Sequence, residues 1–229
     1  MALRAGKPEK IFLNGEAGRI ECVLEEVADP SANKGSVAVV CHPHPLFGGT
    51  MDNKVVHTLS RAFHRLGVST LRFNFRGVGD SDGEHDEGRG ETDDAVAVAD
   101  WAMQRFGGSV TQEATAKRLW LAGFSFGAWI AVRAAARRRC AQLVTIAPPV
   151  QRFAIRDEAQ PDCPWLIVQG SADELVDSDA VLEWVNELGP GPEFVLLPDV
   201  DHFFHGALTD LRDTLLANLG SGDPLATNT

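Results

Sequence analysis

Ser125 is the residue of this sequence best placed to act as a nucleophile. It stands at the centre of Gly123-Phe124-Ser125-Phe126-Gly127, directly after the β-rich run 118–122 and directly before an alanine-rich stretch. A turn this sharp between a strand and a helix forces its central residue into strained backbone angles, so only glycine fits at both flanks. The serine hydroxyl is thereby held out into solvent. The alternative is a plain glycine-rich turn whose serine caps the helix.

A serine hydroxyl needs a base within hydrogen-bond reach, and that base is most often a histidine. His202 lies in the loop 198–204, beyond the last predicted strand and at the carboxyl edge of the predicted sheet, where sites in such folds gather. We therefore predict His202 as the general base. His205 is the competing candidate, and it is weaker because it is expected inside the following helix.

The carboxylate that would hold this base in place is predicted to be Asp173. It follows the strand 164–169 in the segment Gly170-Ser171-Ala172-Asp173-Glu174-Leu175-Val176, at the same sheet edge as Ser125 and His202. An acid there fixes the tautomer of the imidazole. Other nearby carboxylates are more easily explained as solvated loop residues or helix caps. They are Asp157, Asp162, Asp177 and Asp201, of which Asp177 is the predicted cap of the helix 178–188.

Attack by serine on a carbonyl also requires two backbone N–H donors for the developing oxyanion. Phe126, the residue after the nucleophile, is predicted to supply the first. The second is expected from the loop 42–49, where both prolines are excluded because they carry no N–H. Leu46 is the predicted donor, with His44 and Phe47 as alternatives and as candidates for the substrate pocket. The His42-Pro43-His44 pair has no third ligand in sequence reach, so we predict that it shapes the loop and binds no metal.

Short β-rich runs alternate with longer amphipathic stretches through the middle of the chain, a pattern typical of a mostly parallel sheet with helices on both faces. An antiparallel hairpin is predicted at the N-terminal edge, with Asn14-Gly15 and an acidic bend containing Gly18 between its strands. The predicted strands are 11–13, 19–27, 36–42, 68–75, 118–124, 143–147, 165–169 and 193–197, and the predicted helices are 53–66, 92–106, 126–139, 178–188 and 204–219.

One domain, residues 1–219, is predicted to contain all these elements. The tail 220–229 is rich in Gly, Ser, Pro and Thr and is expected to be disordered. Only residues 148–163 separate the strands 143–147 and 165–169, which leaves little room for a cap or lid. We therefore expect an open site that faces solvent.

The composition of the chain argues against several classes of partner. The 229 residues are 44% hydrophobic and carry a net charge of −11, which disfavours binding to nucleic acid. The basic run 137–139 falls at a predicted helix end, where cations complement the helix dipole. No secretory signal, membrane-spanning run or metal-type cysteine spacing is visible, so a cytoplasmic protein with reduced thiols and no membrane insertion is expected.

Taken together, GFSFG, GSADELV, DHFF and the turn RGVGDS give the sequence a resemblance to the α/β-hydrolase superfamily. More narrowly, CHPHPLFGGTMDNKVVHTLSRAF followed by LRFNFRGVGDSDG resembles small bacterial hydrolases without a lid. The resemblance implies a sheet of about eight strands, the chain order Ser125, Asp173, His202 for the triad, and the loop 42–49 as the oxyanion side. Pro43 replaces the more usual glycine, which leaves the second donor open.

The activity expected on these grounds is hydrolysis of a small carboxylic ester through an acyl-enzyme, without a cofactor. Because a missing lid removes the apolar cover that long chains require, short or medium acyl groups are expected. A thioesterase is the nearest alternative, since the same triad serves both leaving groups. A non-catalytic interaction protein on the same scaffold is the alternative from another class.

Overall fold

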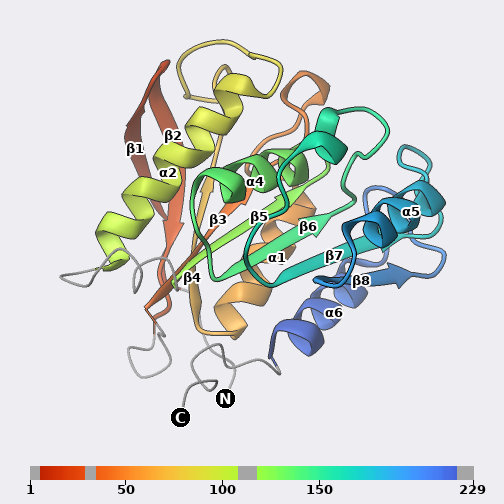
Figure 1. Ribbon diagram of the computed structural model, residues 1–229. Helices are drawn as coiled ribbons and strands as arrows, with labels where there is room; N and C mark the ends of the chain where they lie inside the picture. The colour runs from red at the N-terminus through yellow and green to blue at the C-terminus, as the bar shows by residue number, and fades with distance from the viewer. Residues whose placement is uncertain (1–5, 29–34, 108–117, 221–229) are drawn as a thin grey trace.

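The protein folds around one eight-stranded sheet in the order β1-β2-β4-β3-β5-β6-β7-β8 (Figure 1). The computed structural model describes residues 6–28, 35–107 and 118–220. The predicted tail 221–229 lies outside the described residues. Six strands run parallel through the sheet, namely β4 (Val68–Phe73), β3 (Ser36–Cys41), β5 (Leu119–Phe124), β6 (Gln142–Ile146), β7 (Trp165–Gly170) and β8 (Pro192–Leu197).

The antiparallel edge is the hairpin of β1 (Glu9–Gly15) and β2 (Gly18–Glu25), and β2 also pairs antiparallel with β4. The predicted hairpin is confirmed, and its strands extend further into the predicted turn region. Asn14 and Gly15 are the last residues of β1, paired with Arg19 and Gly18, so the connection is residues 16 and 17. Gly18 has a φ of +122°, a conformation that glycine adopts readily.

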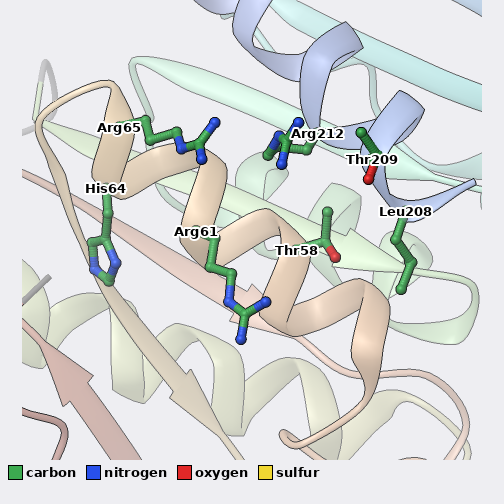
Figure 2. A pocket seen from close by; sticks show the side chains of 7 residues that line it. All are labelled: Thr58, Arg61, His64, Arg65, Leu208, Thr209 and Arg212. Carbon is green, nitrogen blue, oxygen red and sulfur yellow. The ribbon is translucent and has the colours of Figure 1, made fainter. Parts of the chain in front are cut away.

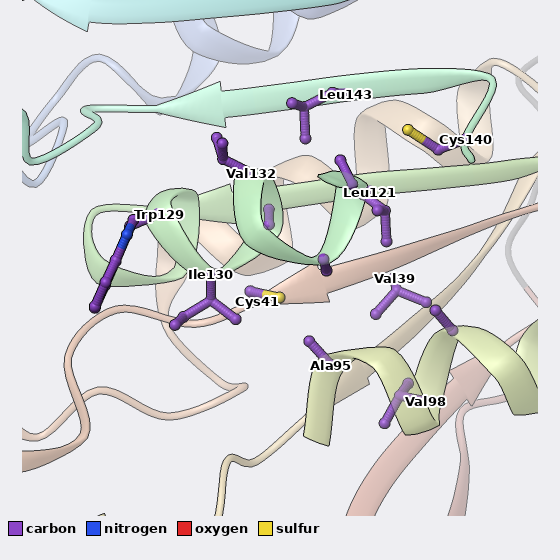
Figure 3. Packing of buried hydrophobic residues seen from close by; sticks show 14 of the residues in the cluster. Val39, Cys41, Ala95, Val98, Leu121, Trp129, Ile130, Val132, Cys140 and Leu143 are labelled. Atoms are coloured by element: carbon purple, nitrogen blue, oxygen red, sulfur yellow. The ribbon is translucent and has the colours of Figure 1, made fainter. Parts of the chain in front are cut away.

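Helices cover both faces of the sheet because alternate strand residues point to opposite sides. Val39 and Cys41 of β3 face the layer that contains α2 (Arg89–Gly107), α4 (Phe126–Arg137) and α5 (Ser178–Leu188) (Figure 3). Ala38 and Val40 face the layer of α1 (Lys54–Arg65) and α6 (Leu208–Gly220). Each large apolar side chain buried in these layers contributes about 1.5–3 kcal/mol to folding. The parallel strands therefore hold their carboxyl ends in fixed positions.

The loops at those carboxyl ends are short. Residues 147–164, between β6 and β7, contain one short 3-10 helix, η2 (Ala154–Asp157). The last helix begins later than predicted, at Leu208 instead of Phe204. Phe204 and Gly206 have φ angles of +58° and +74°, which no α-helix accommodates, so the chain turns here before α6 starts. Within the described part of the chain, no helix combines the length and the apolar character needed to cross a membrane.

The basic run beyond α4 is held by acidic side chains. α4 ends at Arg137, which contacts Asp93, while Arg138 forms a two-pronged pair with Asp100. Arg139 pairs with a further, well-exposed carboxylate. The arginines of the run therefore form ion pairs, in addition to the interaction with the helix dipole that their position predicts.

Candidate active site

The turn between β5 and α4 holds Ser125 in a backbone conformation that few residues adopt. Its φ is +55° and its ψ is −121°, which is strained for a residue with a Cβ. The Ser125 N–H donates to the Ile146 carbonyl over 2.9 Å and so ties the turn to β6. A Cβ on Gly123 would collide with the backbone of Gly127, and a Cβ on Gly127 would collide with the carbonyl group of His42. Close backbone approach therefore requires both glycines.

The hydroxyl of Ser125 faces His202 and leaves α4 uncapped. Ser125 makes no capping hydrogen bond, and its Oγ lies 3.0 Å from Nε2 of His202. On the other side of the imidazole, Nδ1 lies 2.8 Å from Oδ2 of Asp173. The structure thus brings together the three residues singled out from the sequence, although His202 is 77 positions from Ser125 and 29 from Asp173.

The imidazole of His202 is almost completely screened from solvent, with 3% of its side chain exposed. It contacts the rings of Phe124 and Phe203, whose centroids are both 5.1 Å away. The side chain of Asp173 has no exposed surface. Because water is excluded, the two hydrogen bonds of the imidazole are stronger than they would be at the surface.

Every lone-pair direction of the Asp173 carboxylate has a donor. Oδ1 accepts the N–H groups of Val176 at 2.8 Å and Leu175 at 2.9 Å, and Oδ2 accepts His202 and Nε2 of Gln169. Burial alone would raise the pKa of Asp173, but the hydrogen bonds from His202 and from these N–H groups outweigh it and lower the pKa. Asp173 is therefore anionic at neutral pH.

Gln169 is a site residue that the sequence analysis missed. It lies in β7, is fully buried, and donates to Oδ2 of Asp173 over 2.9 Å. The available signal was a polar side chain inside the otherwise apolar strand WLIVQG, at the next-to-last position before the loop that carries the acid. Its position indicates that it fixes the orientation of the carboxylate.

The competing candidates lie away from Ser125. His205 is in the turn before α6, outside the helix predicted for it, and its Nδ1 lies 2.8 Å from the carboxylate of Asp201. Asp177 caps α5, as predicted, by accepting the N–H of Asp179. Asp162 contacts Arg139. Asp157 is the last residue of η2.

The loop 42–49 is shaped from within by His42. This residue is fully buried, its Nδ1–H donates to the Pro43 carbonyl over 2.6 Å, and its Nε2 accepts the Phe75 N–H over 3.1 Å. Burial lowers the pKa of His42 to about 4. The imidazole is therefore neutral and joins the ends of β3 and β4 below the loop.

Leu46 does not occupy the position predicted for it. Residues Pro45–Phe47 form the 3-10 helix η1, in which the Leu46 N–H donates to Nδ1 of His44 over 3.2 Å and the Phe47 N–H donates to the His44 carbonyl. Leu46 is 69% exposed and is absent from the walls of the cavity beside Ser125. Within the described residues, the N–H groups of His44 and Phe126 have no hydrogen-bond acceptor. The structure therefore favours His44 over Leu46 as the second donor.

A cavity of about 580 Å³ opens beside Ser125 and His202. The two predicted pocket residues, His44 and Phe47, both line it. Phe47 is 80% exposed and stands at its mouth. Most of the wall is apolar, and further lining side chains are Pro43, Phe126, Pro149, Phe153, Leu175, Val176 and Phe203. The cavity therefore favours an apolar group next to the serine.

A second cavity, of about 310 Å³, lies between α1 and α6 and has a different character (Figure 2). It is lined by Arg61, Arg65 and Arg212, with Thr58 and other side chains between them. Figure 2 shows the guanidinium groups of Arg65 and Arg212 extending toward one another from the two helices. The Thr58 hydroxyl donates to the Lys54 carbonyl of its own helix.

The described residues contain no group of three or more His, Cys, Asp or Glu side chains arranged to hold a metal ion. Cys140 and Cys163 bring their sulfur atoms to 3.1 Å, and both are free thiols.

Residues 38–214 match the family model described as an alpha/beta hydrolase domain. The chain belongs to the α/β-hydrolase family. This α/β hydrolase is 42% identical to an alpha-beta serine hydrolase homologue from Coxiella burnetii, with 92% of this chain and 97% of that chain covered and a TM-score of 0.84. The fold predicted from the sequence is therefore confirmed.

Two further relatives extend the comparison. A structure from Xanthomonas campestris, described as a serine hydrolase without a lid, is 41% identical over 95% of this chain and 96% of its own, with a TM-score of 0.85. A protein of Rickettsia prowazekii is 37% identical over 85% of this chain and 82% of its own length. In this α/β hydrolase, the connection between β6 and β7 contains one regular element, the short 3-10 helix η2.

Proposed function

We propose that the protein hydrolyses carboxylic esters, with Ser125 as nucleophile, His202 as general base and Asp173 as the group that orients the base. The observation that carries this proposal is the continuous chain of hydrogen bonds, 3.0 Å from Ser125 to His202 and 2.8 Å from His202 to Asp173. Ser125 attacks the ester carbonyl while Nε2 of His202 takes its proton. The proton then passes to the leaving alcohol, and water hydrolyses the acyl-enzyme by the same route in reverse.

The oxyanion of each tetrahedral intermediate is stabilised by the N–H groups of Phe126 and His44. Both residues line the cavity beside Ser125, and neither N–H has an acceptor within the described residues. Oriented donors of this kind lower the barrier most because they are already aligned when charge develops. Nδ1 of His44 accepts the Leu46 N–H, which holds the loop in the form that leaves the His44 N–H available.

The proposed substrates are esters with short or medium acyl chains. The cavity of about 580 Å³ has mainly apolar walls. The connection between β6 and β7 lines the cavity with Pro149, Arg152 and Phe153, and its one helix is the four-residue η2, so it adds no helical cap that could bury a long chain. Longer chains would leave apolar surface in water and gain little from each added carbon.

The test is the rate of hydrolysis of p-nitrophenyl esters of increasing acyl length, measured beside a matched acyl-CoA series. We expect kcat/KM to peak between about four and eight carbons and to fall by about 10³-fold or more in Ser125→Ala. A higher kcat/KM for the acyl-CoA series would redirect the assignment to a thioesterase. Equal rates for wild type and Ser125→Ala in both series would favour a non-catalytic interaction protein.

A further inference from the structure

Arg152 lies in the wall of the cavity that contains Ser125. It belongs to the turn 149–153 after β6, where its N–H donates to the Pro149 carbonyl over 3.1 Å. The next residue, Phe153, stacks on Trp129 with ring centroids 4.8 Å apart and planes at 11°. The backbone hydrogen bond and the stacking of Phe153 therefore fix the turn. This turn places Arg152 among the mainly apolar residues that line the cavity.

Arg152 has no counter-ion in the part of the chain that the structure describes. Its guanidinium forms no ion pair or hydrogen bond there, and none of the residues that line the cavity is an aspartate or glutamate. Neighbouring arginines differ: Arg156 pairs with Glu187 at 2.8 Å, and Arg133 pairs with Glu158 at 3.1 Å. The cation beside the nucleophile is thus left available to a ligand.

The chemistry of a guanidinium defines what that ligand would be. Its fork of N–H donors matches a carboxylate in a two-pronged arrangement. The chain as a whole carries a net charge of −11 and so repels anions at long range. Arg152 is an exposed residue in the cavity wall, so it meets solvent as well as the apolar lining, and its positive charge offsets that repulsion locally. The alternative is a rim arginine that only contacts water.

We propose that Arg152 selects esters that carry a carboxylate, which it binds while Ser125 attacks the ester carbonyl in the same cavity. This inference rests on the ester hydrolysis proposed above and narrows its substrate class. The carboxylate belongs either to the acyl part or to the alcohol part of the ester, and the guanidinium chemistry is the same for both.

Two matched substrate pairs distinguish these sources. On the acyl side, mono-p-nitrophenyl adipate is compared with the same ester bearing a carboxamide in place of the carboxylate. On the alcohol side, 4-carboxyphenyl butyrate is compared with 4-carbamoylphenyl butyrate. The quantity measured is the ratio of kcat/KM for the anionic ester to that for its neutral partner, corrected for spontaneous hydrolysis. Intrinsic differences in leaving group cancel when this ratio is compared between protein variants.

We expect Arg152→Gln to lower the ratio by about tenfold for one of the two pairs, and Arg152→Glu to lower it further, because a charge-assisted pair is lost and then reversed. Added NaCl lowers the wild-type ratio for that pair. Arg156→Gln is the matched control, since Arg156 is outside the cavity wall and already paired, and it keeps the wild-type ratio.

Ratios that stay within twofold of wild type for both pairs in Arg152→Gln and Arg152→Glu would overturn the proposal. The neutral esters separate this result from a failure of ester hydrolysis itself. If wild type cleaves the neutral esters and Ser125→Ala does not, the proposed activity stands and only the role of Arg152 is lost. If wild type cleaves neither member of a pair, the proposed activity fails first.

Discussion

The Ser125 cavity and the α1–α6 cavity differ in what one hydroxyl group of each contacts. At the Ser125 cavity, the serine hydroxyl lies 3.0 Å from an imidazole that is itself 2.8 Å from a carboxylate. At the α1–α6 cavity, the Thr58 hydroxyl donates to the Lys54 carbonyl of its own helix over 2.9 Å. A hydroxyl engaged by its own backbone has no base to activate it. A cavity with polar walls is therefore insufficient for catalysis without this convergence of side chains.

The origin of the difference lies in the elements that supply the side chains. The α1–α6 cavity is bounded by the faces of two helices, whose arginines extend from regular backbone (Figure 2). The Ser125 cavity is bounded by loops at the carboxyl ends of parallel strands, where a strained turn presents one residue and neighbouring loops supply its partners. Parallel strands bring distant parts of the chain to one edge, as open α/β sheets commonly do.

Among the substitutions that test this difference between the cavities, Asp173→Asn is expected to lower the rate of ester hydrolysis most. An amide in place of the carboxylate permits the wrong imidazole tautomer, so kcat should fall by about 10²- to 10⁴-fold. Ester hydrolysis and a thermal unfolding curve are measured together, so that a loss of fold is recognised. Asp201→Asn is the matched control, because Asp201 contacts the exposed His205 instead of His202. Unchanged turnover in Asp173→Asn would contradict the assignment of Asp173 as the group that orients His202.

Substitutions in the α1–α6 cavity are expected to change ester hydrolysis much less. The double substitution Arg65→Gln with Arg212→Gln removes two of its cations but touches no residue of the Ser125 cavity. We expect kcat/KM for a neutral p-nitrophenyl ester to stay within about twofold of wild type, since these two charges lie outside the Ser125 cavity and are screened by salt. A tenfold loss in a variant that melts at the wild-type temperature would show that the two cavities are coupled.

The sequence was sufficient for the parts of the site that depend on strand order. Ser125, Asp173 and His202 each follow a recognisable strand, and parallel strands end at one edge, so their meeting could be predicted. The second oxyanion donor could not. Which N–H of the loop 42–49 is left without an acceptor depends on η1, a 3-10 helix whose hydrogen bonds involve the Leu46 and Phe47 N–H groups.

Other differences between the predictions and the structure also arise from local conformation and contacts. α6 begins later than predicted because Phe204 adopts a positive φ, which periodicity in the sequence does not reveal. Gln169 was overlooked because its role follows from a contact with Asp173 that forms only when β7 and its loop are folded. The proposed role of Arg152 could not be predicted either, because it depends on the absence of a counter-ion among its neighbours in the described part of the fold.

The central claim, that His202 activates the Ser125 hydroxyl, is tested most directly by covalent labelling with a fluorophosphonate followed by peptide mass mapping. The account predicts one adduct per chain, located on Ser125, absent in Ser125→Ala and formed at least about a hundredfold more slowly in His202→Ala. An adduct that forms in His202→Ala as fast as in wild type, or an adduct on a residue other than Ser125, would contradict it.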